Sequence, residues 1–204
     1  MAEIAGLHGL RAAKDKAGAV ATPPYDVIKE GSPLETLLSG NPDSFFHVTL
    51  GPDANGALKE LTAKGALVPD AEPCFYVYEQ KWSGGDRLGF FAAVAVSVYA
   101  EGNIVRHEKT FDEKVKGRLK VTNETGYTLE PIFLLTKSPI QPILEKVRAE
   151  LPVEYALHSD FHGWNDLHGI ASRLWRVPET SPAGPSLRRA VSESPLYIGD
   201  RHHR

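Results

Sequence analysis

The sequence is poor in cysteine, has no excess of basic residues and contains no long hydrophobic segment. Cys74 is the only cysteine among 204 residues, which excludes an intrachain disulfide and is typical of a reducing compartment. The net charge is −3, which argues against a broad nucleic-acid surface. The longest apolar stretch, residues 88–100, is too short to span a bilayer, and its Val, Phe and Tyr content favours a buried strand. The first 20 residues lack the apolar core of a signal peptide. We therefore expect a cytoplasmic protein with no membrane partner.

Several catalytic motifs are also missing. The sequence contains no G-x-x-x-x-G-K-[ST] loop, no G-x-S-x-G elbow and no G-x-G-x-x-G after a strand. A phosphate-binding P-loop, a hydrolase nucleophile elbow and a dinucleotide fingerprint are thus excluded. Cys74 lies within a predicted strand, which favours a buried thiol over a nucleophile.

The secondary structure that is predicted mixes strands with helices. The clearest unit is a β-hairpin over residues 73–99, whose two apolar segments are joined by the glycine-containing turn SGGD. Further strands are predicted at 44–50, 104–108, 130–136, 153–158, 169–177 and 195–199. Helices are predicted at 32–40, 56–67, 110–122, 139–151 and 184–194. Because the two kinds of element do not alternate strictly, the pattern predicts an α+β fold in one domain, 1–204, with a mixed sheet, a central hairpin and flanking helices.

Two of these helices have a recognisable start. Ser32 can cap the first, with Pro33 at its first helical position, Glu35 completing a capping box and Gly40 ending it. A second capping box, from Thr110 to Glu113, opens the helix over 110–122.

The C-terminal segment LYIGDRHHR, residues 196–204, places polar side chains directly after an apolar strand. If the chain turned into a helix there, free backbone N–H groups would form an anion site. Arg204 could hold a phosphate with two donors, His202 and His203 could donate hydrogen bonds or bind a metal, and Asp200 could bind magnesium. The alternative on composition alone is a solvated tail.

A second segment with candidate functional residues is IVRHEKTFDEK, residues 104–114. His107 and Glu108 are adjacent, so in an extended segment their side chains point to opposite faces and at most one of them faces a given cleft. Glu108 could be a general base or a metal-bound carboxylate. A polar strand end that leads into a helix is the alternative.

The segment TPPYDV, residues 22–27, offers Tyr25 and Asp26 on a loop made stiff by two prolines. Rigid loops position functional groups well. A structural turn in which Asp26 caps local backbone explains the same residues.

Four stretches of the sequence together resemble a known family. In order they are ATPPYDV, NPDSFFHV, HEKT and YIGDRHHR, and TLEPIFLL also fits. They are similar to the landmarks of a prokaryotic family of unknown function, DUF1015, over residues 6–204. Members are usually longer, with a DGHHR motif near the middle, which implies that this chain is an N-terminal portion.

The resemblance also implies a chemistry. The DGHHR element is similar to the phosphate-binding element of the ParB and sulfiredoxin superfamily, which includes free-serine kinases. By position, Asp200, His202, His203 and Arg204 would hold nucleotide phosphates and Mg²⁺, and Glu108 is the residue we expect as a base. Accessory residues would be Tyr25, Asp26, His107 and Arg118, the last on the helix that follows HEKT. The implied activity is an ATP- or ADP-dependent kinase that acts on a small molecule, free L-serine.

The sequence departs from the family pattern at two places. Arg201 stands where the family has glycine, and Gly199 stands where it has alanine. Glycine at position 201 would permit a positive φ or a close approach to phosphate. In addition, the sequence stops at Arg204, so we expect the helix that would receive the phosphate to be missing. A ParB-like regulatory module that binds nucleotide without catalysis and an inactive truncated fragment are therefore the alternatives to a kinase.

Overall fold

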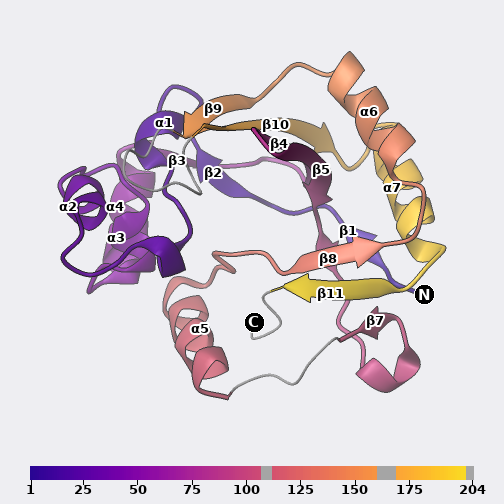
Figure 1. The fold of residues 1–204 in the computed structure, drawn as a ribbon, viewed down its shortest axis with the longest axis horizontal. Helices are drawn as coiled ribbons and strands as arrows, with labels where there is room; N and C mark the ends of the chain where they lie inside the picture. Colours follow the sequence, from indigo (N-terminus) through magenta and orange to yellow (C-terminus); the bar gives the residue numbers. More distant parts are fainter. Residues whose placement is uncertain (107–111, 160–168, 201–204) are drawn as a thin grey trace.

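The computed structural model describes residues 1–106, 112–159 and 169–200. At positions 112–115, 117, 118 and 200 it describes the backbone alone. Helices and strands are both abundant, so the α+β class is confirmed (Figure 1). The strands of the described part are divided among four sheets.

The largest sheet is antiparallel and has four strands in the order β5-β4-β10-β9. Their bounds are Gly85–Phe91, Cys74–Trp82, Ile170–Pro178 and Tyr155–Ser159. The predicted hairpin is thus confirmed as β4 and β5, joined through the glycine-containing turn. Cys74 on β4 is a free and fully buried thiol, and burial raises its pKa, as expected for a structural cysteine.

The apolar stretch 88–100 does not form one buried strand, so that prediction was wrong beyond Phe91. The chain leaves the hairpin there, pairs briefly as β6 (Ala93–Val94) with β1 (Ile4–Ala5) and then forms a 3-10 turn, η2 (Tyr99–Glu101). Val96 is 99% exposed. Strand propensity alone did not hold this segment in the sheet, because its pairing with β4 stops at Phe91 and Tyr76, close to Cys74, where β4 begins.

A three-stranded mixed sheet has the order β7-β11-β8. Its strands are Ile104–Val105, Leu196–Asp200 and Phe133–Thr136. β11 pairs parallel with β7 and antiparallel with β8. Leu196 and Ile198 on β11 are buried, which confirms the prediction of a last buried strand.

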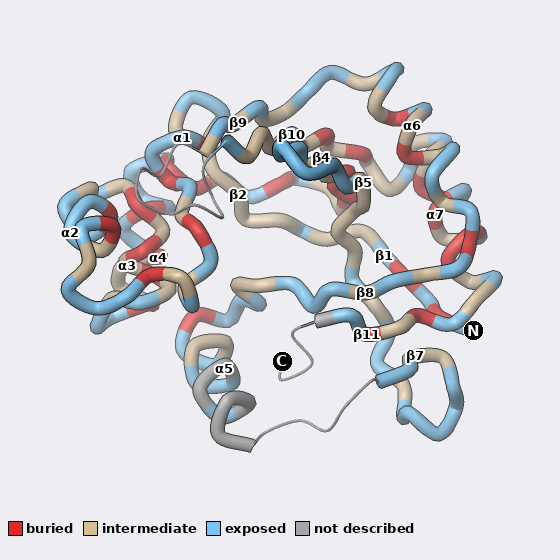
Figure 2. The backbone as a smooth tube through the Cα atoms, viewed as in Figure 1, coloured by how far each residue is buried: buried red, intermediate tan, exposed pale blue. Residues whose placement is uncertain are grey.

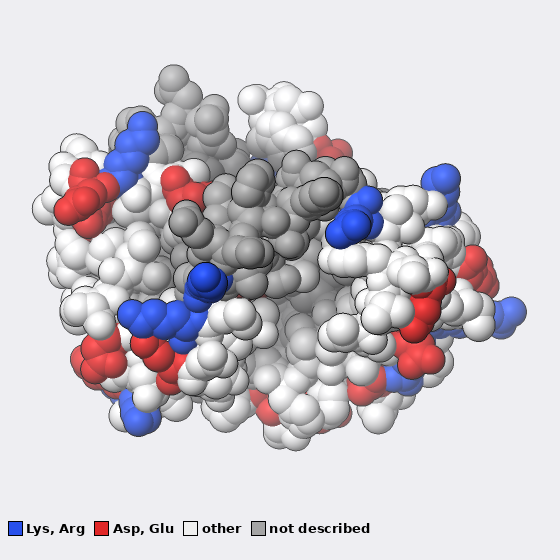
Figure 3. Space-filling model, turned by 90° about the horizontal axis from the view of Figure 1, so that it is seen from below, with Lys and Arg blue, Asp and Glu red and all other residues white. Residues whose placement is uncertain are grey.

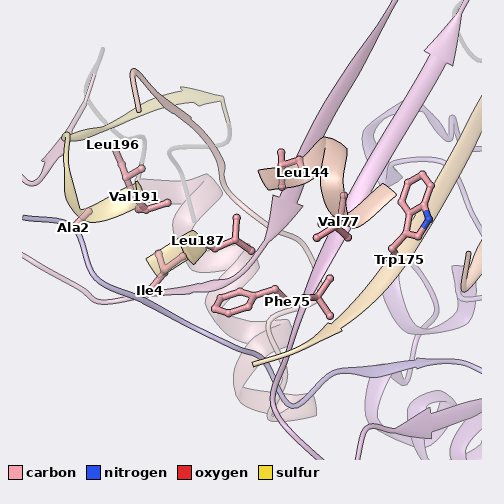
Figure 4. Close-up of a cluster of buried hydrophobic side chains, with 11 residues drawn as sticks. Ala2, Ile4, Phe75, Val77, Leu144, Trp175, Leu187, Val191 and Leu196 are labelled. Carbon is pink, nitrogen blue, oxygen red and sulfur yellow. The ribbon is translucent and has the colours of Figure 1, made fainter. Parts of the chain in front are cut away.

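The main hydrophobic core lies between these two sheets and two helices, α6 (Gln141–Glu150) and α7 (Ala183–Ser192). Figure 1 shows both helices on one side of the molecule, at one end of the sheets, and Figure 4 shows their side chains converging with those of the strands. Leu144 and Leu187, one from each helix, are fully buried beside Phe75 and Val77 of β4. Figure 2 shows the same distribution, with buried segments on the inner sides of α6 and α7.

Four short helices and a two-stranded sheet form a second part of the fold with its own small cores. The helices α1, α2, α3 and α4 span Ala17–Val20, Pro33–Ser39, Phe46–Thr49 and Ala54–Ala63. The sheet pairs β2 (Leu10–Ala12) with β3 (Leu67–Pro69). The predicted helix over 56–67 is confirmed as α4, with Leu58 and Leu61 buried.

The predicted strand over residues 44–50 is wrong, because these residues form the helical turn α3. Ser44 is buried, and its hydroxyl accepts a hydrogen bond from the Phe46 N–H at 3.2 Å, which starts the turn. Phe46 packs with α2 and Val48 packs with α4. The aromatic and β-branched residues that favour a strand here fill two separate cores, and no neighbouring strand offers a partner.

Helix α2 begins at the predicted cap. The Ser32 hydroxyl accepts a hydrogen bond from the Glu35 N–H at 3.1 Å, and the Glu35 carboxylate accepts one from the Gly31 N–H at 2.6 Å. We expect Ser32→Ala to lower the free energy of unfolding by about 1 kcal/mol, since one N–H at the helix start loses its partner. Chemical denaturation measures this. Ser39→Ala, at the other end of α2, is the control, and an equal loss in both variants would contradict a capping role.

The fourteen-residue helix α5 (Asp112–Thr125) connects the two parts and contacts α4. Its start falls beside Thr110, which lies outside the described residues. Among the helices that the structure describes, none is both long enough and apolar enough to cross a membrane. On the face seen in Figure 3, acidic and basic side chains of the described residues lie close to one another.

Candidate functional site

The two polar segments singled out in the sequence follow two neighbouring parallel strands. Leu196 and Tyr197 of β11 pair with Ile104 and Val105 of β7. Because the strands are parallel, their carboxyl ends lie at the same edge of the sheet. β7 ends two residues before His107, and β11 ends at Asp200. The chain therefore leaves toward both polar segments from one edge.

The carboxyl end of β11 is irregular. Its pairing with β8 shifts register between Ile198 and Asp200, so that Asp200 lies opposite Phe133. Bulges of this kind bend a strand and re-aim its side chains, and they are common next to active sites. Gly199 fits the bulge because a Cβ there would lie 3.0 Å from the Phe133 ring. The alanine of the family pattern would need this ring to shift by a few tenths of an ångström.

The rest of β11 is held firmly. Leu196 packs in the main core and Ile198, two residues on, is also buried, and Tyr197 on the other face lies under Lys137, whose Nζ is 5.4 Å from the ring centroid. One residue after the neighbouring strand β7, the Arg106 guanidinium lies 5.1 Å from the Tyr99 ring centroid. A rigid strand can hold a functional group in a fixed place at its end better than a loop can.

The β4–β5 hairpin contributes a cation near this edge. The Arg87 guanidinium lies 5.8 Å from the ring centroid of Phe133, the pairing partner of Asp200. Its Nε donates a hydrogen bond to the side-chain amide oxygen (Oε1) of Gln80 at 2.7 Å, and Nη2 donates to the same oxygen. Sequence reasoning missed Arg87, Gln80 and Phe133. The one sequence feature that could have indicated Arg87 is its place on a hairpin strand, two residues before a glycine in the middle of that strand.

Most of the site residues predicted from the sequence lie outside the described residues: His107, Glu108, His202, His203 and Arg204. Asp200 is the last described residue of β11, and Arg118 belongs to α5, both by backbone alone. For these residues, the structure therefore describes only the strands and the helix that carry or precede them.

Tyr25 and Asp26 belong to a 3-10 turn, η1 (Tyr25–Val27). Asp26 is exposed, and its side chain caps no helix end. Val27 and Ile28 pack against α2 and α3, which fixes the turn in the helical part of the fold. The rigid loop that the two prolines predict is present, while no described contact joins Asp26 to β11.

A buried polar cluster that the sequence did not reveal joins β2 and β3 to the four-stranded sheet. We call it the Asp70 cluster. Asp70 accepts a hydrogen bond from Arg11 Nε at 2.8 Å and one from the Tyr76 hydroxyl at 2.5 Å. Burial and this hydrogen bond raise the pKa of Tyr76. Burial by itself would lower the pKa of Arg11, but its bonds to Tyr155 and Asp70 raise it overall.

The function of the Asp70 cluster is structural. Arg11 also donates to Glu154 and to the Tyr155 hydroxyl, both at 2.9 Å. Each oxygen of Asp70 thus accepts a hydrogen bond, and Arg11 is paired with two carboxylates. Among the described residues of the cluster, the hydrogen-bonding groups are therefore used within the fold and not for a ligand. Among the described residues no group of three or more His, Cys, Asp or Glu side chains could hold a metal ion.

Comparison with known proteins gives one match. A family model described as "Protein of unknown function (DUF1015)" matches residues 4–204. No curated protein and no solved structure matches the chain. Because the family model covers nearly the whole chain, including both strands that lead to the polar segments, the chain belongs to the DUF1015 family.

Proposed function

We propose that this protein is a nucleotide-dependent kinase that phosphorylates a small hydroxylated molecule, with free L-serine as the acceptor and ATP or ADP as the donor. The observation that supports the proposal is the parallel pairing of β7 with β11. The described strands that precede His107 and Arg201 therefore have their carboxyl ends at one edge of one sheet. A base and a phosphate-binding group from the segments that follow these strands could then act on the same ligand.

The roles follow from the chemistry of each side chain. In the proposal His202, His203 and Arg204 bind the nucleotide phosphates, as does the ParB/sulfiredoxin-like element that this segment resembles. Glu108 accepts the proton of the serine hydroxyl. The hydroxyl oxygen forms a bond to the terminal phosphorus, the bond from that phosphorus to the bridging oxygen breaks, and the shortened nucleotide leaves with that electron pair. Arg204 stabilises the charge that develops on the leaving oxygen.

Magnesium fits the donor that β11 supplies. Mg²⁺ is usually bound by one or two carboxylates together with phosphates and water, and Asp200 offers one carboxylate at a strand end. When bound, the ion would neutralise charge on the phosphates. Tyr25, Asp26, His107 and Arg118 are proposed as accessory residues, with Arg118 on the helix that follows the HEKT segment.

A nucleotide-binding regulatory module without catalysis is the second candidate. Arg201 in place of the family glycine is the reason to consider it, because a side chain at that position alters the placement of a bound phosphate, on which transfer depends more strictly than binding. The two candidates differ in turnover and share nucleotide binding.

We expect the protein to form O-phosphoserine from L-serine, Mg²⁺ and ATP or ADP, and Arg204→Ala to lower the rate by about 100-fold, because a donor to the transferring phosphate is lost. Mass spectrometry of O-phosphoserine and calorimetry with each nucleotide measure the two steps. Arg189→Ala is the control, since Arg189 is exposed on α7.

Three results would discriminate between the candidates. Nucleotide binding without O-phosphoserine would support the regulatory module and contradict the kinase. An Arg204→Ala variant with the wild-type nucleotide affinity and the wild-type phosphorylation rate would show that Arg204 is not part of the site. A protein that binds neither nucleotide would contradict both candidates.

A further inference from the structure

Gly89 is a glycine that the described fold does not require. It lies in the middle of β5 with extended backbone and no positive φ. A Cβ at this position would meet no atom of the described residues within 4 Å. A glycine inside a strand weakens the strand, and it often marks a place where a ligand approaches the backbone closely. Gly89 thus leaves open space, one side chain deep, on this face of the strand, and we call this space the recess over Gly89.

The recess opens on the face of β5 that points away from the main core. Leu88 and Phe90 pack against that core, so the alternating residues Arg87, Gly89 and Phe91 share the opposite face. Gly89 has Arg87 on one side along the strand and Phe91 on the other. A ligand over Gly89 would therefore contact a cation at one end and an aromatic ring at the other.

The aromatic wall is fixed by contacts on the neighbouring strands. Tyr78 lies directly opposite Gly89 on β4. Its ring lies 5.4 Å from that of Phe91 between centroids, and its hydroxyl is hydrogen-bonded to the Ser172 hydroxyl at 3.2 Å. These contacts hold the Tyr78 ring in a set orientation, and they keep it out of the space above Gly89.

The cation at the other end has a charge that its described neighbours do not neutralise. Arg87 is held by the amide oxygen of Gln80 and by the Phe133 ring, which are both uncharged. In the part of the chain that the structure describes, no carboxylate forms an ion pair with it, and Nη1 donates no hydrogen bond. A guanidinium oriented in this way suits the two oxygens of a carboxylate or two oxygens of a phosphate.

The recess adjoins the proposed phosphotransfer site. The ring that Arg87 contacts belongs to Phe133, and Phe133 is the pairing partner of Asp200 at the end of β11. The hairpin face and the carboxyl end of β11 therefore meet at this ring. A molecule bound over Gly89 would extend toward that end.

We propose that the recess over Gly89 binds the carboxylate of a small amino acid through Arg87, with the aromatic wall of Tyr78 and Phe91 beside it. This inference rests on the proposed function, because the proposed kinase activity identifies the bound amino acid as the acceptor, L-serine. A phosphate, like a carboxylate, can present two oxygens to the guanidinium of Arg87. A carboxylate is the better match because the proposed kinase already assigns the phosphates to residues 202–204, and because the recess is no wider than one missing side chain.

The test fills the recess without disturbing the fold. Gly89→Val adds a side chain that favours strands into open space, so the melting temperature is expected to stay the same or rise. The dissociation constant for L-serine, measured by calorimetry, is expected to rise at least about tenfold because the side chain occupies the ligand's place. Gly18→Ala is the matched control: Gly18 in α1 also has no described atom near a Cβ, and L-serine binding is expected to be unchanged.

A second pair of variants tests the cation. Arg87→Gln is expected to weaken L-serine binding by about tenfold or more, the loss that follows removal of a charged hydrogen-bond donor. Nucleotide affinity is expected to stay at the wild-type value. Arg189→Gln on α7 is the control. Ethanolamine, which has the amine and hydroxyl of serine but no carboxylate, is expected to bind weakly and equally to the wild type and to Arg87→Gln.

The outcomes separate this inference from the proposed kinase. L-serine binding that depends on Gly89 and Arg87, without any O-phosphoserine, supports the recess and contradicts the kinase. A wild-type protein that binds no L-serine, or a Gly89→Val variant that binds it normally, overturns the inference. If inorganic phosphate binds in an Arg87-dependent way and L-serine does not, the anion is a phosphate and the carboxylate assignment is wrong.

Discussion

Replacing Asp70 by alanine is expected to lower the free energy of unfolding by about 3 to 5 kcal/mol, the usual cost of removing one partner from a buried ion pair. The side chain of Asp70 is 2% exposed, and that of Arg11 is 21% exposed. Without the carboxylate, Arg11 retains Glu154 but loses its buried acceptor, and the Tyr76 hydroxyl loses its partner as well. Urea denaturation followed by circular dichroism measures the change.

Two further variants show whether the loss comes from this cluster. Asp15→Ala removes an exposed carboxylate outside the cluster and is expected to change stability by less than about 0.5 kcal/mol. Tyr76→Phe removes only the hydroxyl. The double variant of Asp70→Ala with Tyr76→Phe is expected to show a coupling energy of about 0.5 to 3 kcal/mol. Full additivity would mean that the hydrogen bond between these two residues contributes nothing to stability.

Trp175→Ala is expected to cost about 3 to 5 kcal/mol, because a large side chain in the main core leaves a cavity. Trp175 on β10 is 1% exposed and packs in the same cluster as Phe75, Val77 and Leu144 (Figure 4). Substitution by phenylalanine is expected to cost much less, on the order of 1 kcal/mol. The indole N–H of Trp175 has no acceptor among the described residues, so removing it also removes the cost of an unpaired buried donor.

Guanidinium denaturation followed by circular dichroism compares the two variants without relying on tryptophan fluorescence. Trp82→Phe is the control, since Trp82 is 43% exposed at the end of the hairpin strand, and we expect little change. If Trp175→Phe cost as much as Trp175→Ala, the indole N–H would have to be hydrogen-bonded in solution.

The elements that sequence patterns predicted well are those that local chemistry decides. Helix α2 begins at Ser32 because its hydroxyl bonds a backbone N–H three residues away. The hairpin forms because two alternating segments are separated by a flexible turn of a few residues. The strand predicted at 44–50 failed for the complementary reason. Its residues favour strands, but a strand needs a neighbouring strand to pair with. A helical turn forms instead, because it lets Phe46 and Val48 pack into two separate cores.

The candidate site was predictable in part. Asp200 and the polar residues after it were proposed because they follow an apolar strand directly, and Glu108 was proposed as a base because the kinases of the superfamily that the sequence resembles need one; both assignments stay predictions. Arg87 was missed, since nothing near it in the sequence indicates that the hairpin reaches Phe133, 46 positions later. The Asp70 cluster was missed for the same reason: Arg11, Asp70 and Tyr155 are far apart in the chain.

The sequence by itself determined the α+β class, the membership of the DUF1015 family and the identity of the polar segments. These depend on local propensity and on the order of short motifs, both of which can be read along the chain. Only the tertiary structure decided that β7 and β11 are parallel neighbours, so that the two strands preceding the polar segments end at one sheet edge, and that open space lies over Gly89, two residues from Arg87 on the same strand. The physical reason is that strand pairing and buried ion pairs join residues separated by tens of positions, so their energies depend on how the whole chain packs.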